Sequence, residues 1–259
     1  KNKNLSNITL VGMGGSIMGS KSIYSFLKDK IKKKFFFLDN FEYKEIKKKN
    51  KLNLSISKSG NTLETIVNLN IILNKKIKNI FITENNENYL RSLAIKLKSD
   101  VVDHNNFIGG RYSVLSEVGM LPAMLMGLKV DKFRKFNELI KNKFFLDSVI
   151  NSVSNKINLI KKKKSNSVIL NYDEKSLDLF YWYQQLVAES LGKKSKGILP
   201  IISKMPQDNH SLMQFYLDGT KNNFYTFFFT KEKFSQRIKN EEILKTHNYL
   251  KQKNSTTTN

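Results

Sequence analysis

Three hydroxyl side chains and a glycine lie within six residues, in a segment whose composition suits the binding of a phosphate group. Ser57, Ser59 and Thr62 supply the hydroxyls, Gly60 frees the backbone, and a helical pattern begins immediately afterwards. Hydroxyls, backbone N–H groups and the positive end of a helix dipole together bind anions. Thr62 could instead simply cap the helix, but a cap needs one hydroxyl rather than three. We therefore predict a phosphate-binding loop over residues 57–62.

A second segment, residues 12–19, is rich in glycine and follows an apolar run near the start of the chain. Glycines let backbone N–H groups come close to a ligand. The segment is also similar to the dinucleotide-binding pattern Gly-x-Gly-x-x-Gly, although Ile17 occupies the position of the third glycine. Two alternatives therefore stay open for this loop: a nucleotide site, with Asp39 binding the ribose, and a purely structural turn.

Five segments together resemble one family. Residues 57–64 are similar to the phosphosugar loop of the sugar isomerase (SIS) family, and four other segments resemble its phosphoglucose isomerase branch. These are Gly-Gly-Ser at 14–16 with Gly19, Gly-Gly-Arg-Tyr-Ser-Val-Leu-Ser at 109–116, Gln-Leu-Val-Ala-Glu-Ser-Leu-Gly-Lys at 185–193, and His-Ser-Leu-Met-Gln at 210–214. The resemblance implies a homodimeric enzyme that needs no metal or nucleotide cofactor. Its expected reaction is the interconversion of glucose 6-phosphate and fructose 6-phosphate through a cis-enediol.

The resemblance also implies catalytic roles. Glu189 is expected to be the base that moves a proton between C2 and C1, and the apolar face of its helix would place it in a partly desolvated pocket. Arg111, with its permanent charge, is expected to stabilise the enediolate, with a structural salt bridge as the alternative. His210 is expected to help open the sugar ring from the partner subunit of a dimer, with a surface or capping histidine as the alternative.

The same resemblance gives the expected substrate ligands. Gln185 lies one helical turn before Glu189, on the same face. The phosphate is expected to contact Gly15, Ser16, Ser57, Lys58, Ser59 and Thr62. No segment after Phe234 resembles the part of the family that carries a late catalytic lysine, and the family's first segment is also absent. We therefore expect a fragment, cut at both ends, that forms a phosphosugar pocket with an incomplete catalytic set.

Two further functions stay open at this point. A dual phosphoglucose/phosphomannose isomerase would share the fold and the base. A non-catalytic module that senses phosphosugars would need the loop 57–62, but not Glu189, Arg111 and His210 together.

Elements that could hold these residues follow from the hydrophobic pattern. Short apolar runs alternate with helical patterns, which is typical of a doubly wound parallel sheet. Strands are expected at 8–11, 35–38, 52–56, 80–83, 101–103, 167–171 and 223–230, and helices at 16–28, 42–49, 62–74, 87–98, 176–190, 210–217 and 232–252, with a loop over 192–209. The predicted class is α/β, with two SIS-like doubly wound parallel-sheet domains (three-layer α/β/α). The first covers residues 1–130 and the second, truncated one covers 166–259, with a helical bridge over 131–165.

Composition argues against several other functions. The 259 residues carry a net charge of +23, but only four of the 45 basic residues are arginines, whereas specific nucleic-acid sites favour arginine. The lysines are spread along the whole chain, so we expect no nucleic-acid partner. There are no cysteines and the three histidines lie far apart, so we expect no metal site. No apolar run reaches the roughly 18 residues of a membrane span and no signal segment opens the chain, so we expect a cytoplasmic protein without membrane contact.

Overall fold

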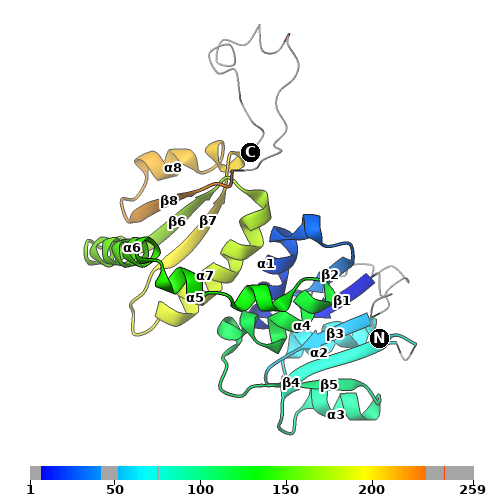
Figure 1. Cartoon of the computed structure of the whole chain (residues 1–259). Helices are drawn as coiled ribbons and strands as arrows, with labels where there is room; N and C mark the ends of the chain where they lie inside the picture. The colour runs from blue at the N-terminus through cyan, green and yellow to red at the C-terminus, as the bar shows by residue number, and fades with distance from the viewer. Residues whose placement is uncertain (1–6, 42–51, 75, 232–241, 243–259) are drawn as a thin grey trace.

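Two parallel β-sheets organise the chain, as Figure 1 shows. The computed structural model describes residues 7–41, 52–74, 76–231 and 242. The first sheet has five strands in the order β2-β1-β3-β4-β5, and the second has three in the order β7-β6-β8. Every strand pair is parallel. The predicted α/β class is therefore confirmed.

The first sheet contains all five strands that the apolar runs between residues 8 and 103 predict. They are β1 (Asn7–Val11), β2 (Lys34–Leu38), β3 (Leu52–Ile56), β4 (Lys78–Glu84) and β5 (Asp100–His104). The accompanying helices are α1 (Met18–Phe26), α2 (Leu63–Ile72), α3 (Tyr89–Lys96) and α4 (Glu117–Leu125), with the short 3₁₀ turns η1 (Gly14–Ser16), η2 (Lys28–Lys30), η3 (Gly110–Leu115) and η4 (Val130–Arg134). The helix predicted at 42–49 lies outside the described residues.

Helices cover both faces of the first sheet. Successive side chains of a strand point to opposite faces, and the two faces build separate cores. Leu54 of β3 belongs to the larger core, which also takes Ile23 of α1 and Val118 of α4. Phe81 of β4 belongs to the smaller core, where it packs with α2 and α3 through residues such as Leu90. This part of the chain is therefore a three-layer arrangement.

The second sheet contains one strand that the sequence did not predict. Its strands are β6 (Asn166–Asn171), β7 (Leu199–Lys204) and β8 (Asn223–Phe228), and its helices are α7 (Leu177–Leu191) and α8 (Met213–Asp218), with the 3₁₀ turns η5 (Glu174–Ser176) and η6 (Gln207–Asn209). The predicted loop over 192–209 is wrong, because β7 lies inside it. Helix α8 also begins later than predicted, at Met213. The final helix predicted at 232–252 lies outside the described residues apart from Glu242.

Pro200 explains why β7 escapes prediction. A proline has no N–H to donate, so it argues against a strand in the middle of a sheet. Within the described structure β7 is an edge strand that pairs only with β6, where Pro200 is opposite Ser167. An edge strand does not need the missing N–H on its open side.

Helix α7 connects the two sheets. It packs against α1 on one side and β7 on the other, and Figure 1 shows it between the sheets. The Ser22 hydroxyl of α1 donates to the Asp178 carbonyl at 2.7 Å, and Lys175 Nζ lies 2.8 Å from Asp29 Oδ2. These contacts hold the first turn of α7 against α1 and η2.

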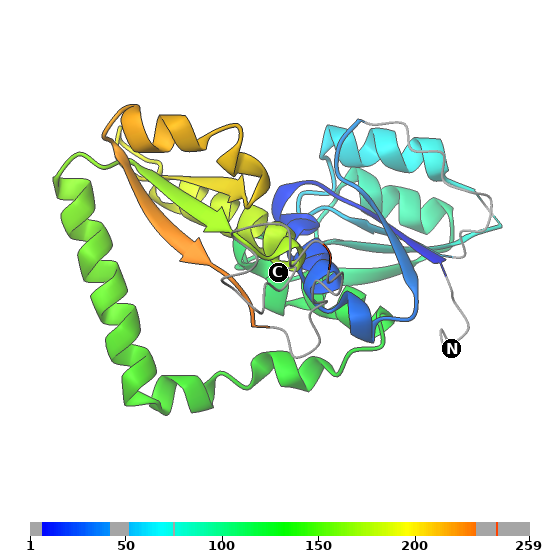
Figure 2. The ribbon, with the colours of Figure 1, turned by 90° about the horizontal axis from the view of Figure 1, so that it is seen from above.

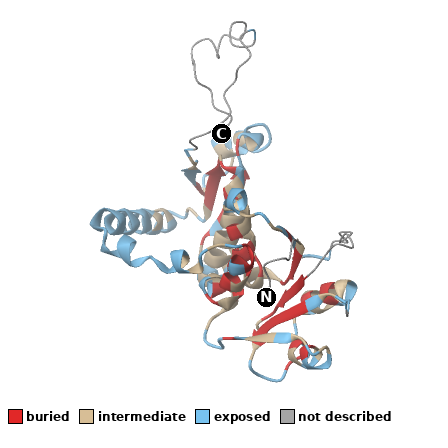
Figure 3. Cartoon of the chain, turned by 45° about the vertical axis from the view of Figure 1, so that its right-hand side comes forward, coloured by how far each residue is buried: buried red, intermediate tan, exposed pale blue. Residues whose placement is uncertain are grey.

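Helices α5 (Asn137–Lys141) and α6 (Lys143–Lys161) form the connection between the two sheets along the chain. Helix α6 lies on the outside, and none of its residues is buried, as Figures 2 and 3 show. No helix among the described residues is long and apolar enough to cross a membrane. The domain boundaries at 130 and 165 stay a prediction.

Candidate active site

The glycine-rich loop and the predicted phosphate loop start from neighbouring strands. The strand order reverses between β1 and β3, and ligands of open α/β sheets bind at the carboxyl edge where this happens. Val11 lies opposite Ser55 in the pairing of these strands. A Cβ added to Gly12 would lie 3.0 Å from the Ile56 carbonyl oxygen. The two loops therefore leave the sheet side by side.

Residues 57–62 form a compact turn whose hydroxyls come together. Ser57 Oγ lies 2.9 Å from Thr62 Oγ1 and accepts a hydrogen bond of 3.2 Å from the Gly60 N–H. Gly60 has a φ of +67°, a conformation that favours glycine. Ser59 is exposed, and its hydroxyl accepts a 3.3 Å hydrogen bond from the Asn61 N–H. Two of the three predicted phosphate hydroxyls thus contact each other directly.

Thr62 precedes the first turn of α2 at the N-cap position. Within the described structure its side chain makes no capping hydrogen bond. The first N–H groups of a helix have no partner inside the helix, so this end of α2 is suited to an anion. The Thr62 hydroxyl therefore does not cap α2, contrary to the alternative considered from the sequence.

Lys58 directs its ammonium group away from these hydroxyls. Its Nζ donates to the carbonyl oxygens of Asn106 at 2.8 Å and Ile108 at 3.1 Å, and lies 3.3 Å from Glu84 Oε1. An ammonium group has three N–H donors, and three oxygen acceptors engage it here. A phosphate contact from Lys58 would come from its backbone, or would require one of these bonds to open.

Gly14 and Gly15 allow three segments of the chain to meet. Gly14 has a φ of +51°, and a Cβ at this position would lie 2.9 Å from Gln185 Nε2. A Cβ on Gly15 would lie 2.2 Å from the Gly110 carbonyl carbon and 2.6 Å from the Arg111 nitrogen. A side chain at position 15 would therefore displace the backbone that carries Arg111.

Asp39 and Ser16, two polar residues at the glycine-rich loop 12–19, differ in their contacts. Asp39, a candidate ribose ligand, forms an ion pair with Lys21 of 2.6 Å, which gives this carboxylate a structural role. Ser16 is partly buried, and its hydroxyl makes no hydrogen bond within the part of the chain that the structure describes. The Ser16 hydroxyl is therefore able to bind a ligand.

The predicted base and the predicted cation contact each other. Arg111 Nη1 lies 2.8 Å from Glu189 Oε1, and Arg111 Nε donates to Ser190 Oγ at 2.9 Å. Gln185 Nε2 donates to Glu189 Oε2 at 3.3 Å, so the two α7 side chains do share a face. The Glu189 side chain is 50% exposed. The carboxylate is thus ion-paired at the surface rather than enclosed in the partly desolvated pocket that the sequence suggested.

Tyr112 and Ser190 complete the surroundings of Arg111. Tyr112 Oη lies 2.9 Å from Ser190 Oγ, and the guanidinium carbon of Arg111 is 4.7 Å from the centre of the Tyr112 ring. The Ser190 hydroxyl and the neighbouring guanidinium lower the pKa of Tyr112. The Tyr112 hydroxyl and the Glu189 carboxylate in turn raise the pKa of Arg111. The raised pKa keeps the Arg111 guanidinium positively charged.

Sequence reasoning did not single out Tyr112, Ser190 or Trp182, whose Nε1 donates to the Arg111 carbonyl at 3.3 Å. Tyr112 and Ser190 each stand beside a predicted residue, inside the segments 109–116 and 185–193 that resemble the family. Nothing in the spacing shows that positions 112 and 190 meet.

His210 is not brought to this cluster. It is exposed, and its imidazole makes no hydrogen bond or ion pair among the described residues. The turn before it is held by Asp208, whose carboxylate accepts from Ser203 Oγ at 2.9 Å, Lys204 N at 2.7 Å and Ser211 Oγ at 3.0 Å. Burial alone would raise the pKa of Asp208, but these hydrogen bonds outweigh it and lower that pKa. His210 therefore sits on a fixed turn with a free side chain.

A metal site is not evident in this part of the molecule. Within residues 7–41, 52–74, 76–231 and 242, no group of three or more His, Cys, Asp or Glu side chains could hold a metal ion.

Similar proteins are sugar-phosphate isomerases. The family profile described as Phosphoglucose isomerase matches residues 1–215. A glucose-6-phosphate isomerase from Methanocaldococcus jannaschii is 35% identical over 262 residues, which cover 92% of this chain and 63% of that protein. The chain spans less than two thirds of the length of the curated relatives that it matches first.

Solved structures share the fold. A hypothetical protein from Thermus thermophilus matches with a TM-score of 0.79 at 25% identity, over 95% of this chain and 65% of that one. A glucose-6-phosphate isomerase from Chlamydia trachomatis matches with a TM-score of 0.66 at 20% identity, over 87% of this chain and 50% of that one. Because the family profile covers most of its length, the chain belongs to the phosphoglucose isomerase family.

Proposed function

We propose that the protein containing this chain interconverts glucose 6-phosphate and fructose 6-phosphate through a cis-enediol. The observation that supports this most is the 2.8 Å contact between Arg111 and Glu189, at the carboxyl edge of the first sheet. Moving a proton between two carbons needs a base and a stabilised oxyanion. A carboxylate and a guanidinium in contact supply both groups.

The phosphate of the substrate is proposed to bind at the turn 57–62. Ser57, Ser59 and Thr62 would donate hydroxyl hydrogen bonds, and the uncapped first turn of α2 would add N–H groups and the helix dipole. Gly15, Ser16 and Lys58 would border the same site from the neighbouring loop and from within the turn.

Proton transfer is proposed to use the freed carboxylate of Glu189. Before substrate binds, Arg111 is occupied by Glu189 and Ser190. A substrate whose C1 and C2 oxygens accept the guanidinium donors would release Glu189 Oε1. Glu189 would then take the proton from C2 and return it to C1, while Arg111 stabilises the enediolate. Gln185 would hold Glu189 Oε2 throughout.

Ring opening is proposed to involve His210 from the partner subunit of a homodimer. Its exposure, and the lack of a hydrogen bond or ion pair from its imidazole to any described residue, support a contact with a second subunit. The proposed enzyme works in the cytoplasm, with a sugar phosphate as its substrate and no nucleic-acid or membrane partner. For the 259 residues alone we propose a phosphosugar pocket with an incomplete catalytic set.

A coupled assay on the full-length protein tests the proposed reaction. Glucose 6-phosphate should be converted into fructose 6-phosphate, detected by an enzyme that consumes the ketose. Added turnover of mannose 6-phosphate would instead indicate the dual phosphoglucose/phosphomannose isomerase. Tight binding of both hexose phosphates without any conversion would contradict the proposal and support a sensing module.

A further inference from the structure

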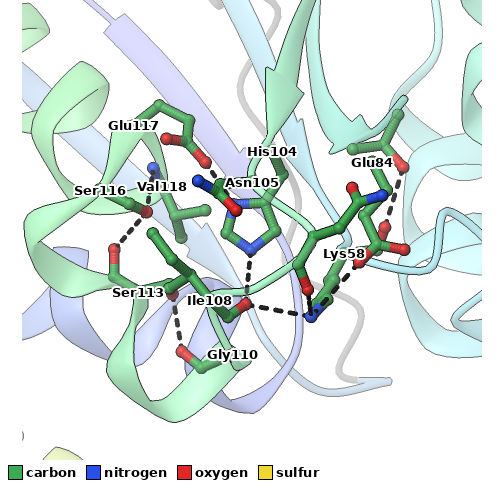
Figure 4. A network of polar contacts seen from close by, with 12 residues as sticks. Lys58, Glu84, His104, Asn105, Ile108, Gly110, Ser113, Ser116, Glu117 and Val118 are labelled. Carbon is green, nitrogen blue, oxygen red and sulfur yellow. Dashed lines mark hydrogen bonds and ion pairs between the residues drawn. The ribbon is translucent and has the colours of Figure 1, made fainter.

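Two side chains converge on one backbone carbonyl next to the candidate active site. The Ile108 carbonyl oxygen accepts a hydrogen bond of 3.1 Å from Lys58 Nζ and lies 3.1 Å from His104 Nε2, as Figure 4 shows. A carbonyl oxygen has two lone pairs, and the two side chains occupy both. One donor comes from the turn 57–62 and the other from the end of β5.

The contacts of His104 define its hydrogens. Because a carbonyl only accepts, Nε2 must carry the hydrogen that reaches Ile108. Nδ1 is in contact with Glu117 Oε1. His104 is 2% exposed, so water does not compete for either nitrogen. Glu117 stands in the first turn of α4, where the helix dipole favours a carboxylate.

The Ile108 carbonyl is the last one before Arg111 that accepts hydrogen bonds from side chains outside the turn η3. Gly109 and Gly110 follow it, and two glycines in succession give the backbone wide freedom. On the far side, within η3, the Tyr112 N–H donates to the Gly109 carbonyl at 2.9 Å and the Ser113 hydroxyl donates to the Gly110 carbonyl at 2.6 Å. Without a hold on Ile108, the approach to Arg111 would be fixed at one end only.

Lys58 links this anchor to the phosphate turn. Its own carbonyl accepts from the Glu84 N–H at 3.1 Å and from the Thr83 hydroxyl at 3.2 Å. The end of β4 thus holds the backbone of Lys58 while its side chain holds Ile108. One continuous set of hydrogen bonds therefore runs from the phosphate turn to the loop that carries Arg111.

We propose that His104 is a positioning residue. Through the Ile108 carbonyl, together with Lys58, it holds the loop 105–110 so that Arg111 meets Glu189. The catalytic part of this inference rests on the proposed isomerase function, whereas the hold on the loop does not. The alternative is a core histidine whose two nitrogens are satisfied without consequence for Arg111.

Two conservative variants separate these possibilities, because each keeps half of the imidazole contacts. The amide nitrogen of glutamine corresponds to Nε2, so His104→Gln retains a donor for Ile108 and loses Glu117. The amide nitrogen of asparagine corresponds to Nδ1, so His104→Asn retains the Glu117 contact and loses Ile108. The released Glu117 side chain is 25% exposed and can be hydrated in the glutamine variant.

Hydrogen–deuterium exchange and steady-state kinetics of the full-length protein provide the test. In His104→Asn the backbone amides of residues 108–112 should exchange roughly tenfold faster, the factor that one net hydrogen bond provides. The kcat should fall by a similar factor, while the affinity for inorganic phosphate stays within about threefold. His104→Gln should stay within about threefold of the parent protein in all three measurements.

Equal effects of the two variants on exchange and kcat, or no effect of either, would overturn the proposal. The melting temperature is measured for both, because a purely structural histidine predicts that exchange follows the loss of stability. If the parent protein shows no isomerase activity, the proposed function fails, but the exchange comparison still tests the hold on the loop.

Discussion

Gly15 shows how a residue without a side chain brings two parts of the site together. A Cβ at this position would come within 2.2 Å of the Gly110 carbonyl carbon, a distance that forces the backbone to move. At Gly110 itself, an added Cβ would meet nothing closer than the Gly15 Cα at 3.9 Å, which is ordinary contact. The two glycines face each other but tolerate a methyl group very differently.

Gly15→Ala should therefore cost about 1 to 3 kcal/mol of unfolding free energy, as overpacking does. Moving Arg111 by about 1 Å should also reduce the isomerase rate by roughly 100-fold. Urea unfolding and the coupled assay measure the two effects. Gly110→Ala is the matched control and should lower stability by less than about 1 kcal/mol. Equal stability losses in the two variants would refute the close approach.

The turn before α2 gives a prediction at the scale of an element. Thr62→Ala should weaken the binding of inorganic phosphate by roughly tenfold. Because the contact with Ser57 is lost, the free energy of unfolding should fall by no more than about 1 kcal/mol. Asn142→Ala is the control, chosen to lose a similar amount of stability to Thr62→Ala. The Asn142 side chain accepts from the Phe145 N–H at 3.1 Å and caps α6. That variant should also lose about 1 kcal/mol but bind phosphate normally. Calorimetry that found the two variants alike in phosphate binding would remove the Thr62 hydroxyl from the proposed phosphate site.

The turn between β7 and α8 should respond to pH through Asp208. Its pKa is lowered in the folded protein, so its contribution to stability is fully present above the ordinary pKa of about 3.9 and is lost as pH falls through the folded value. Asp208→Asn should lower the free energy of unfolding by about 1 kcal/mol at pH 7. Solvent screening at this partly exposed position keeps the loss small.

The difference in unfolding free energy between Asp208→Asn and the parent protein, measured by urea unfolding, should shrink as the pH falls below about 4. Asp218→Asn serves as the control, since the Asp218 side chain is exposed and has no hydrogen bond or ion pair among the described residues. A pH-independent difference for Asp208→Asn would contradict this account.

The strands of the first sheet could be predicted because each is a short apolar run between turn or helix signals. β7 could not, because Pro200 weakens the strand pattern and only the pairing with β6 shows that it is an edge. The site was predictable only in part. The hydroxyls of the turn 57–62 follow from residue type, but the contact of Arg111 with Glu189 joins positions 78 apart in sequence. The convergence of His104 on Ile108 depends on side-chain direction, for which the sequence carries no periodic signal.

Across the whole molecule, α6 makes little contribution to the described packing. It contacts chiefly α5, and Ile150 is 63% exposed. Ile150→Ala in the 259-residue chain should therefore change the unfolding free energy by less than about 0.5 kcal/mol. Ile82→Ala makes the same chemical change in the core, where Ile82 is 0% exposed, and should cost about 2 to 5 kcal/mol. Similar losses in the two variants, measured by urea unfolding, would mean that α6 packs against part of this chain.

The arrangement of the two sheets explains why the site needs both parts of the described molecule that contain them. The turn 57–62 and Arg111 follow strands of the first sheet, whereas Glu189 is carried by α7, which packs against α1 and β7. The proposed chemistry therefore depends on the contact between α7 and α1 as much as on the residues that perform it.

Exchange of the C2 proton of glucose 6-phosphate with solvent is the most direct test of Glu189 as the base. In deuterated water, the full-length protein should replace the C2 proton of glucose 6-phosphate with deuterium. The loss of the C2 proton signal is followed by proton NMR. Glu189→Gln should slow this incorporation by at least the roughly 10²- to 10⁴-fold attributable to a general base, while sugar-phosphate affinity stays nearly unchanged. Exchange retained in Glu189→Gln would contradict the central claim.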